Sequence, residues 1–239
     1  MKILRICFDY LPKINVVNAS NVHSASLFLF HGSGATGSNF KEWIDILNRE
    51  ELKFPHIKII YPTAPLQPYT PLGGMQSHVW FDRKSISIEA QEDAQSINSM
   101  CVTIAELIDK EISDGIPNDK IVVAGFSMGG ALSMYLSYRY KLSLAGCCAM
   151  SSFLNKNSLV YQHLKNNPGI HAPPLLQFHG VNDKLVPIKW GEECYNSLKE
   201  LGVNTQFVPL NNVDHELSKI EIQAFKEWIL DILPQKLFD

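Results

Sequence analysis

Excess positive charge and long apolar runs are both absent from this chain of 239 residues. Its net charge of −3 lacks the basic excess that nucleic-acid-binding proteins use to hold phosphates. No apolar run reaches the length of about 18 residues that a membrane-spanning helix needs. The sequence therefore predicts neither nucleic acid as a partner nor a membrane-spanning protein.

Cysteines are few, and their spacing excludes two further classes of protein. The five of them are scattered and odd in number: Cys7, Cys101, Cys147, Cys148 and Cys194. Such a set is typical of reduced thiols and favours a cytoplasmic location over a disulfide framework. Neither the adjacent cysteines 147 and 148 nor the pair His215–Glu216 has metal-ligand spacing, so we expect no metal.

The first 13 residues combine basic residues with a short apolar stretch, as signal peptides do. Asp9 and Pro12 interrupt that stretch early, and no cleavage site with small residues follows it. We therefore expect a first strand here.

The rest of the chain alternates short apolar runs with amphipathic stretches. Six near-continuous apolar runs predict strands buried on both faces of a mostly parallel sheet, at residues 26–30, 57–61, 120–125, 144–150, 174–179 and 205–210. Apolar spacings of three and four predict helices over 91–113 and 188–201. A capping box at Ser218 and Glu221 predicts the start of a last helix, which Pro234 ends. We expect one α/β domain over 1–239, with helices on both faces of the central sheet.

Residues 62–80 interrupt this alternation with four prolines spaced by three. The spacing matches a polyproline recognition motif, but the segment lies inside the domain and not in a tail. We therefore predict a rigid surface loop with a functional role.

A candidate nucleophile stands in the segment GFSMGG, residues 125–130, between an apolar run and a helical pattern. A Gly-x-Ser-x-Gly motif at a strand-to-helix junction is typical of the nucleophile elbow, a sharp turn that exposes the serine hydroxyl. The simpler alternative is a glycine-rich turn with an incidental serine. The context favours Ser127 as a nucleophile.

A serine nucleophile needs a base and an acid, which in this fold follow it in the order acid, histidine. Of the four later histidines, His215 lies in a loop between the last strand and the last helix and can reach back to the serine. Asp183 follows a strand end, at the sheet edge where ligands collect. Asp214 is a competing acid, but it adjoins His215 and would break the order. The sequence predicts a Ser127–His215–Asp183 triad.

Acyl transfer also needs preset donors for the tetrahedral oxyanion. The N–H of Met128, directly after the nucleophile, is one candidate. The second is the N–H of Ser33 in the segment HGSGATG, residues 31–37, which follows an early strand. A phosphate-binding loop is disfavoured because the segment lacks a Gly-Lys-Ser/Thr ending.

Several longer blocks are far more specific than the elbow: FLFHGSGATG, IKIIYPTAP, VWFDR, GFSMGGALS, SSFLNK, HGVNDKLV and HELSK. Together they resemble the acyl-protein thioesterase and lysophospholipase family of α/β-hydrolases, from about His23 to Pro234. The resemblance implies the α/β-hydrolase fold and the triad and donors named above. It also implies that the proline-rich loop, Trp80 and Gly34 border the substrate site.

The activity implied by the resemblance is hydrolysis of acyl thioesters or esters through an acyl-enzyme, without a cofactor. Depalmitoylation of S-acylated proteins and cleavage of lysophospholipids are family activities, and transient contact with a membrane surface is compatible with both. The better-known thioesterases carry leucine at position 33 and glutamine at position 128, so the shape of the acyl pocket does not follow. The alternatives are a short-chain carboxylesterase with a shallow pocket and a non-catalytic binding module that keeps the elbow as scaffold.

Overall fold

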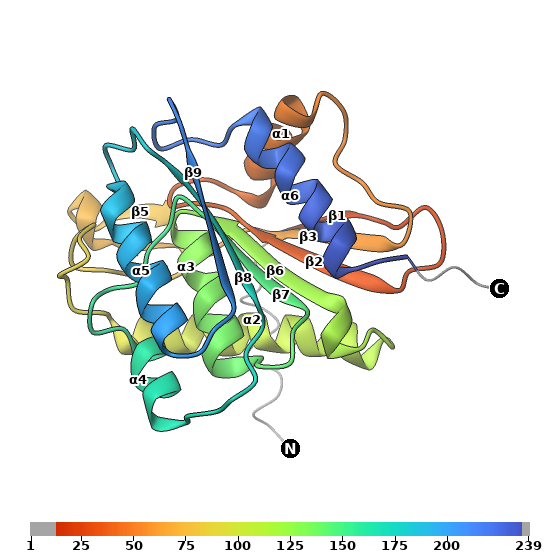
Figure 1. Cartoon of the computed structure of the whole chain (residues 1–239). Coiled ribbons are helices and arrows are strands. Elements are labelled where there is room, and N and C mark those ends of the chain that lie inside the picture. The colour runs from red at the N-terminus through yellow and green to blue at the C-terminus, as the bar shows by residue number, and fades with distance from the viewer. Residues whose placement is uncertain (1–12, 236–239) are drawn as a thin grey trace, which may run out of the picture.

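A seven-stranded sheet forms the centre of the computed structural model, which describes residues 13–235 (Figure 1). Its strands are β1 (Ile14–Val17), β2 (Ala25–Phe30), β3 (Ile57–Pro62), β6 (Ile121–Phe126), β7 (Gly146–Met150), β8 (Leu175–Gly180) and β9 (Thr205–Leu210). They lie in the order β1-β3-β2-β6-β7-β8-β9, and all neighbours are parallel except β1 and β3. The six predicted strands are confirmed to within two residues, whereas the strand predicted over the first 13 residues lies almost wholly outside the described range.

Burial explains why the strand pattern was continuous and not alternating. Every residue of β2, β6, β7 and β8 is buried, because these central strands carry helices on both faces. Along β2, Phe28 and Phe30 contribute to one core, while Leu27 and Leu29 contribute to the other. One strand therefore supplies both halves of the interior.

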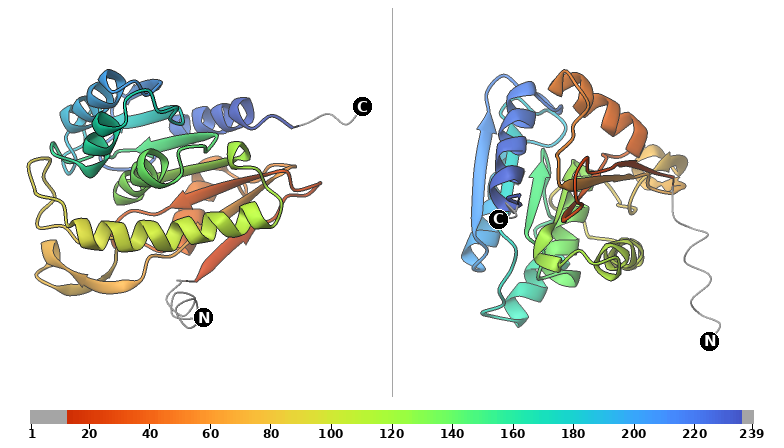
Figure 2. Two further views of the ribbon diagram at one scale, coloured as in Figure 1. Left: turned by 90° about the horizontal axis from the view of Figure 1, so that it is seen from below. Right: turned by 90° about the vertical axis from the view of Figure 1, so that its right-hand side faces the viewer.

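Helices cover both faces of the sheet (Figure 2). They are α1 (Gly37–Asn48), α2 (Ala94–Ser113), α3 (Met128–Tyr135), α4 (Leu159–Asn166), α5 (Ile188–Glu200) and α6 (Lys219–Ile232), with short turns of other helical types at Thr70–Leu72, Asn118–Lys120 and Leu136–Tyr140. Buried side chains of α1 and α6 belong to one core, and those of α2, α3, α4 and α5 to the other. The predicted arrangement of helices on both faces is confirmed.

The helix boundaries follow their capping residues. The capping box of α6 is present in both directions, since Ser218 Oγ accepts from the Glu221 N–H and the Glu221 carboxylate accepts from the Ser218 N–H. The helix ends at Ile232, two residues before Pro234. In α5 the last turn closes at Leu201, followed by Gly202 with φ +88.

The proline-rich segment, predicted as a rigid surface loop, contains regular structure. It forms a two-stranded antiparallel hairpin, β4 (Leu66–Tyr69) and β5 (Met75–His78), in a sheet of its own. Proline lacks a donor but is compatible with an extended edge strand, where Pro68 stands. Gly73 and Gly74, with φ of +65 and +82, allow the chain to turn back.

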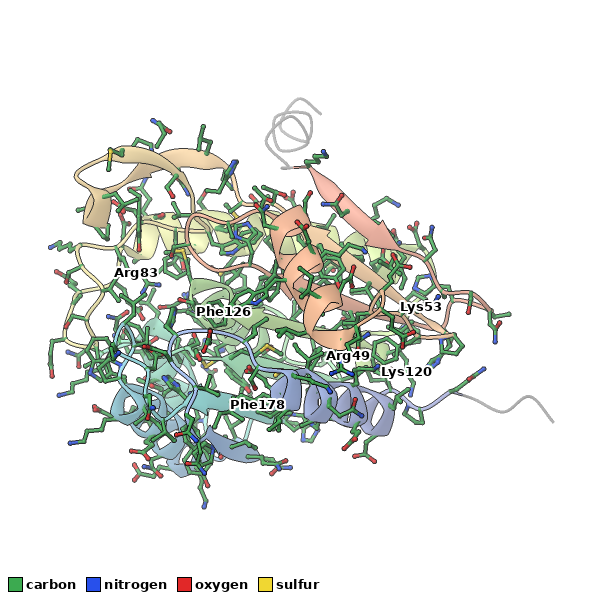
Figure 3. All side chains as sticks on the ribbon, turned by 90° about the horizontal axis from the view of Figure 1, so that it is seen from above. Arg49, Lys53, Arg83, Lys120, Phe126 and Phe178 are labelled. Carbon is green, nitrogen blue, oxygen red and sulfur yellow. The ribbon has the colours of Figure 1, made fainter. Side chains whose placement is uncertain are left out.

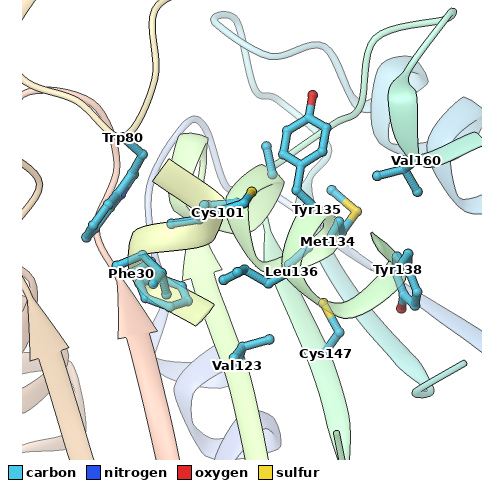
Figure 4. Packing of buried hydrophobic residues seen from close by; sticks show 14 of the residues in the cluster. Phe30, Trp80, Cys101, Val123, Met134, Tyr135, Leu136, Tyr138, Cys147 and Val160 are labelled. Carbon is cyan, nitrogen blue, oxygen red and sulfur yellow. The ribbon is translucent and has the colours of Figure 1, made fainter. Parts of the chain in front are cut away.

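The core beneath the hairpin contains Trp80, which is fully buried. Its ring meets Phe30 edge to face at 5.3 Å between centroids (Figure 4). The same core cluster includes sulfur-bearing side chains of α2, α3 and β7, among them Cys101, Met134 and Cys147. This cluster supports the carboxyl ends of β2 and β6 from one side.

Candidate active site

Ser127 makes the turn from β6 to α3 by itself, since β6 ends at Phe126 and α3 begins at Met128. Its φ of 53 and ψ of −117 lie in a region that non-glycine residues rarely adopt, at a cost of about 1–3 kcal/mol. From Ile121 to Tyr138 it is the one residue that is not buried. The strained turn therefore presents a hydroxyl from an otherwise closed core, as a nucleophile elbow does.

The flanking glycines are required by close approach of backbone. A Cβ at Gly125 would lie 2.4 Å from the carbonyl carbon of Gly129. A Cβ at Gly129 would lie 2.1 Å from the carbonyl oxygen of Phe30. Both distances are far below van der Waals contact, so the elbow can form only with glycine at these positions.

The structure brings Ser127, His215 and Asp183 together in one chain of hydrogen bonds. His215 Nε2 lies 3.1 Å from Ser127 Oγ, and His215 Nδ1 lies 2.7 Å from Asp183 Oδ2. Because a carboxylate only accepts, Nδ1 carries the hydrogen and Nε2 has a free lone pair directed at the serine. The His215 ring also packs against Phe126, at 4.8 Å between centroids. Phe126, the last residue of β6, is labelled in Figure 3. This is the geometry that a serine nucleophile and its base require.

The Asp183 side chain is fully buried, and each of its oxygens accepts hydrogen bonds. Oδ1 accepts from the N–H groups of Leu185 and Val186 at 3.0 and 2.7 Å, and Oδ2 accepts from His215. Asp214 instead faces solvent. Its Oδ1 accepts from the backbone of Lys184 and His215, and these bonds lower its pKa. The preference for Asp183 over Asp214 agrees with this geometry.

The remaining late histidines are bonded elsewhere or lie far along other elements. His179 is fully buried at the end of β8, where its Nε2–H donates to the carbonyl of Val186 at 2.8 Å, and burial lowers its pKa. His163 lies in the last turn of α4, and His171 lies in the exposed loop before β8. Only His215 contacts the serine among these.

The two predicted oxyanion donors lie side by side. Ser33 Oγ is 3.7 Å from Met128 Sδ, so the loop after β2 meets the start of α3. Neither the Ser33 N–H nor the Met128 N–H has a hydrogen-bond acceptor within residues 13–235. Two free N–H groups beside the serine, one of them at a helix N-terminus, suit a developing negative charge.

The two residues expected to border the substrate site differ from each other in exposure. Gly34 is exposed with φ +83, and its N–H donates to His78 O at 2.9 Å, which ties the loop to β5. Trp80 has no exposed surface, so its side chain does not line an open site in this structure. Its indole N–H donates to His31 O at 2.8 Å because a buried indole needs an acceptor. Trp80 therefore supports the loop from below.

Two residues of the site were not identified from the sequence. Ser152 Oγ donates to the carbonyl of Ser127 at 2.7 Å and so holds the strained elbow. His31 Nδ1–H donates to Gly32 O at 2.7 Å, and its Nε2 accepts from the Ala64 N–H at 2.9 Å. Burial lowers the pKa of His31 to about 4, which keeps the ring neutral and able to accept. His31 directly follows β2 and Ser152 lies two residues after the end of β7, and this position at the end of a parallel strand is the one signal in the sequence that marks them.

Among the described residues, His, Cys, Asp and Glu side chains do not gather in groups of three or more as metal ligands would. Within the same range, no helix has both the length and the apolar character to cross a bilayer.

Known proteins are similar to this chain over most of its length. The family model described as Phospholipase/Carboxylesterase matches residues 11–233. Lysophospholipase-like protein 1 of Mus musculus is 49% identical over 225 residues, which cover 94% of this chain and 93% of that protein. Acyl-protein thioesterase 1 homolog 2 of Dictyostelium discoideum is 32% identical over 221 residues, which cover 92% and 97%.

Among solved structures, Zea mays acyl-protein thioesterase 2 superposes with a TM-score of 0.80 at 26% identity, covering 93% of this chain and 99% of that one. The family match spans nearly the whole chain and confirms the resemblance noted in the sequence. The mostly parallel sheet with helices on both faces confirms the expected fold. The chain belongs to the phospholipase/carboxylesterase family of α/β-hydrolases.

Proposed function

We propose that this chain is a serine hydrolase that cleaves acyl thioesters and esters through an acyl-enzyme intermediate. The observation that carries the proposal is the chain of hydrogen bonds from Ser127 through His215 to Asp183. Ser127 is also the one accessible residue of an otherwise buried elbow, from Ile121 to Tyr138. The family membership supports the same reaction class.

In the first step Ser127 Oγ attacks the acyl carbonyl carbon, and His215 Nε2 takes the hydroxyl proton. Asp183 fixes the Nδ1–H tautomer and stabilises the imidazolium that forms. The carbonyl oxygen becomes an oxyanion and accepts from the N–H groups of Ser33 and Met128. His215 then protonates the departing thiol or alcohol. Water repeats the sequence on the acyl-enzyme and releases the acid, so the protein itself supplies every group that the reaction needs.

We propose S-acylated proteins and small acyl esters as substrates, since relatives at 32% identity are named acyl-protein thioesterases. A cytoplasmic location suits such substrates and agrees with the four buried free thiols at positions 101, 147, 148 and 194.

Transient contact with a membrane surface belongs to the same proposal. The hairpin exposes three apolar side chains, Leu66, Leu72 and Met75, at 58%, 45% and 63% of their surface. Exposed apolar side chains along a hairpin suit a weak, reversible lipid contact. More of the parent chain than of a Leu66→Ser/Met75→Ser variant should sediment with phosphatidylcholine vesicles. Equal amounts in the pellet would show that the hairpin is not the lipid contact.

A short-chain carboxylesterase is the second candidate, favoured by the burial of Trp80. A side chain without exposed surface offers no wall to a long acyl chain. Rates with esters and thioesters of rising chain length separate the two candidates. A steep fall beyond short acyl groups would favour the esterase, and activity on palmitoyl thioesters would favour the thioesterase.

Covalent labelling with a fluorophosphonate tests the common reaction. The parent chain should be labelled, and Ser127→Ala should not be. Ser99→Ala, which changes an exposed serine on α2, is the matched control and should be labelled like the parent. A folded parent chain that resists labelling would favour the non-catalytic binding module instead.

A further inference from the structure

The side chain of Ser33 has a donor without a strong acceptor. Among the described residues, its hydroxyl contacts one acceptor, Met128 Sδ at 3.7 Å. A thioether sulfur is only a weak acceptor. Ser33 is also exposed, so its hydroxyl is free to turn toward a bound molecule.

The loop that carries Ser33 packs directly on the elbow through Gly32, the residue before it. A Cβ added to Gly32 would lie 3.4 Å from Ser127 Cβ and 3.1 Å from Phe126 Cδ1. On its other side the hydroxyl contacts Met128, the residue that follows the nucleophile. The Ser33 hydroxyl therefore belongs to a loop that contacts both the nucleophile and the residue that follows it.

The loop that carries Ser33 is fixed on both sides. Before it, the Trp80 indole N–H donates to the carbonyl of His31, whose ring N–H donates to the carbonyl of Gly32. After it, the Gly34 N–H donates to the carbonyl of His78. A donor on a fixed loop needs little reorganisation as charge develops, which is the condition for effective oxyanion stabilisation.

We propose that the Ser33 hydroxyl is a third donor to the oxyanion, beside the N–H groups of Ser33 and Met128. The inference rests on the proposed function. Before reaction the hydroxyl donates to the Met128 sulfur. As the oxyanion forms, the hydroxyl turns about χ1 and donates to the far stronger charged acceptor. The N–H and the hydroxyl of one residue can converge on one acceptor, so both contacts are made together.

The test compares Ser33→Ala with Ser33→Thr, which keeps the hydroxyl. Loss of one oxyanion donor costs about 10²–10³-fold in kcat where the donor is a primary one, and we expect about 10- to 100-fold for this third donor. The KM for a soluble ester should stay within about twofold, because the contact forms only in the transition state. Ser33→Thr should recover most of the loss.

A trifluoromethyl ketone provides the readout that a merely structural role would not move. It forms a tetrahedral oxyanion adduct with the serine, so its affinity should fall in Ser33→Ala by the same factor as kcat/KM. The exposed-serine control Ser99→Ala should leave both values unchanged. If Ser33→Ala fails to fold, Ser33→Cys replaces it, since a thiol is a weak donor of similar size.

Two results would overturn the inference: kcat of Ser33→Ala within twofold of the parent, or a loss of kcat without loss of ketone affinity. Fluorophosphonate labelling distinguishes failure of this inference from failure of the proposed function. If the parent chain is labelled and Ser33→Ala keeps full activity, only the role of the Ser33 hydroxyl as third donor is refuted. If the parent chain is not labelled, the proposed hydrolase activity itself is refuted.

Discussion

At the scale of single residues, two neighbouring acids in the same region of the site differ in what their oxygens contact. Asp183 is buried and accepts the His215 Nδ1–H, whereas Asp214 is exposed and accepts only backbone N–H groups and Lys184. A buried carboxylate that orients an imidazole has a role that an exposed one cannot take over.

Asp183→Asn should therefore lower kcat by about 10³–10⁴-fold, because an amide favours the wrong histidine tautomer. Asp214→Asn keeps an oxygen acceptor for its backbone partners and should stay within about threefold of the parent, as exposed substitutions do. Steady-state rates with a soluble ester, on variants shown by circular dichroism to be folded, measure both. Equal losses in the two variants would refute the assignment of Asp183.

At the scale of elements, the start of α6 combines a cap with a burial cost. Glu221 closes the capping box but is fully buried, and its Oε1 has no hydrogen-bond partner within the described residues. Burial raises its pKa to about 8 from an ordinary value of 4.5, against the opposing effect of the Ser218 N–H. The last helix is thus capped by a carboxyl that the interior favours in its neutral form.

Because the pKa of Glu221 is raised in the folded state, its contribution to stability is fully present below pH 4.5. That contribution is lost as the pH rises toward about 8 and the buried carboxyl must ionise. Each pKa unit corresponds to about 1.4 kcal/mol, so the parent should lose several kcal/mol relative to Glu221→Gln across this range. Urea unfolding of both proteins at pH 5 and pH 8.5 measures the difference. A difference that does not change with pH would show that Glu221 ionises normally.

At the scale of the whole molecule, one sheet joins two cores, since single strands contribute side chains to both faces. Neither core is complete without the shared strands. For this reason we propose that the chain is a single folding domain, as its residue pattern suggested.

Unfolding should then follow one transition at every probe. The four tryptophans report on different places: Trp43 and Trp228 pack against one core, Trp80 lies in the other, and Trp190 packs against a smaller cluster. Fluorescence of variants that keep one tryptophan each should give urea midpoints that coincide with far-ultraviolet circular dichroism. Different urea midpoints for tryptophans on the two faces of the sheet would show that the chain unfolds as two units.

Local chemistry determined much of this protein. Buried strands, amphipathic helices and capping residues act over a few neighbours, so their patterns predicted the sheet and helices 91–113, 188–201 and the last one. The elbow was predictable for the same reason, because glycines, a serine and a strand end are adjacent in the chain. The order of acid and histidine then selected Asp183 and His215.

Only the tertiary structure decided what those residues contact. Trp80 is a loop support and not a pocket wall, because its indole N–H is paired inside the core with His31 O. The proline-rich segment became a hairpin because its own two halves pair across two glycines. The contact between Ser33 and Met128 joins residues 95 positions apart. Contacts between residues so far apart in the sequence depend on how whole elements pack, and no local pattern encodes them.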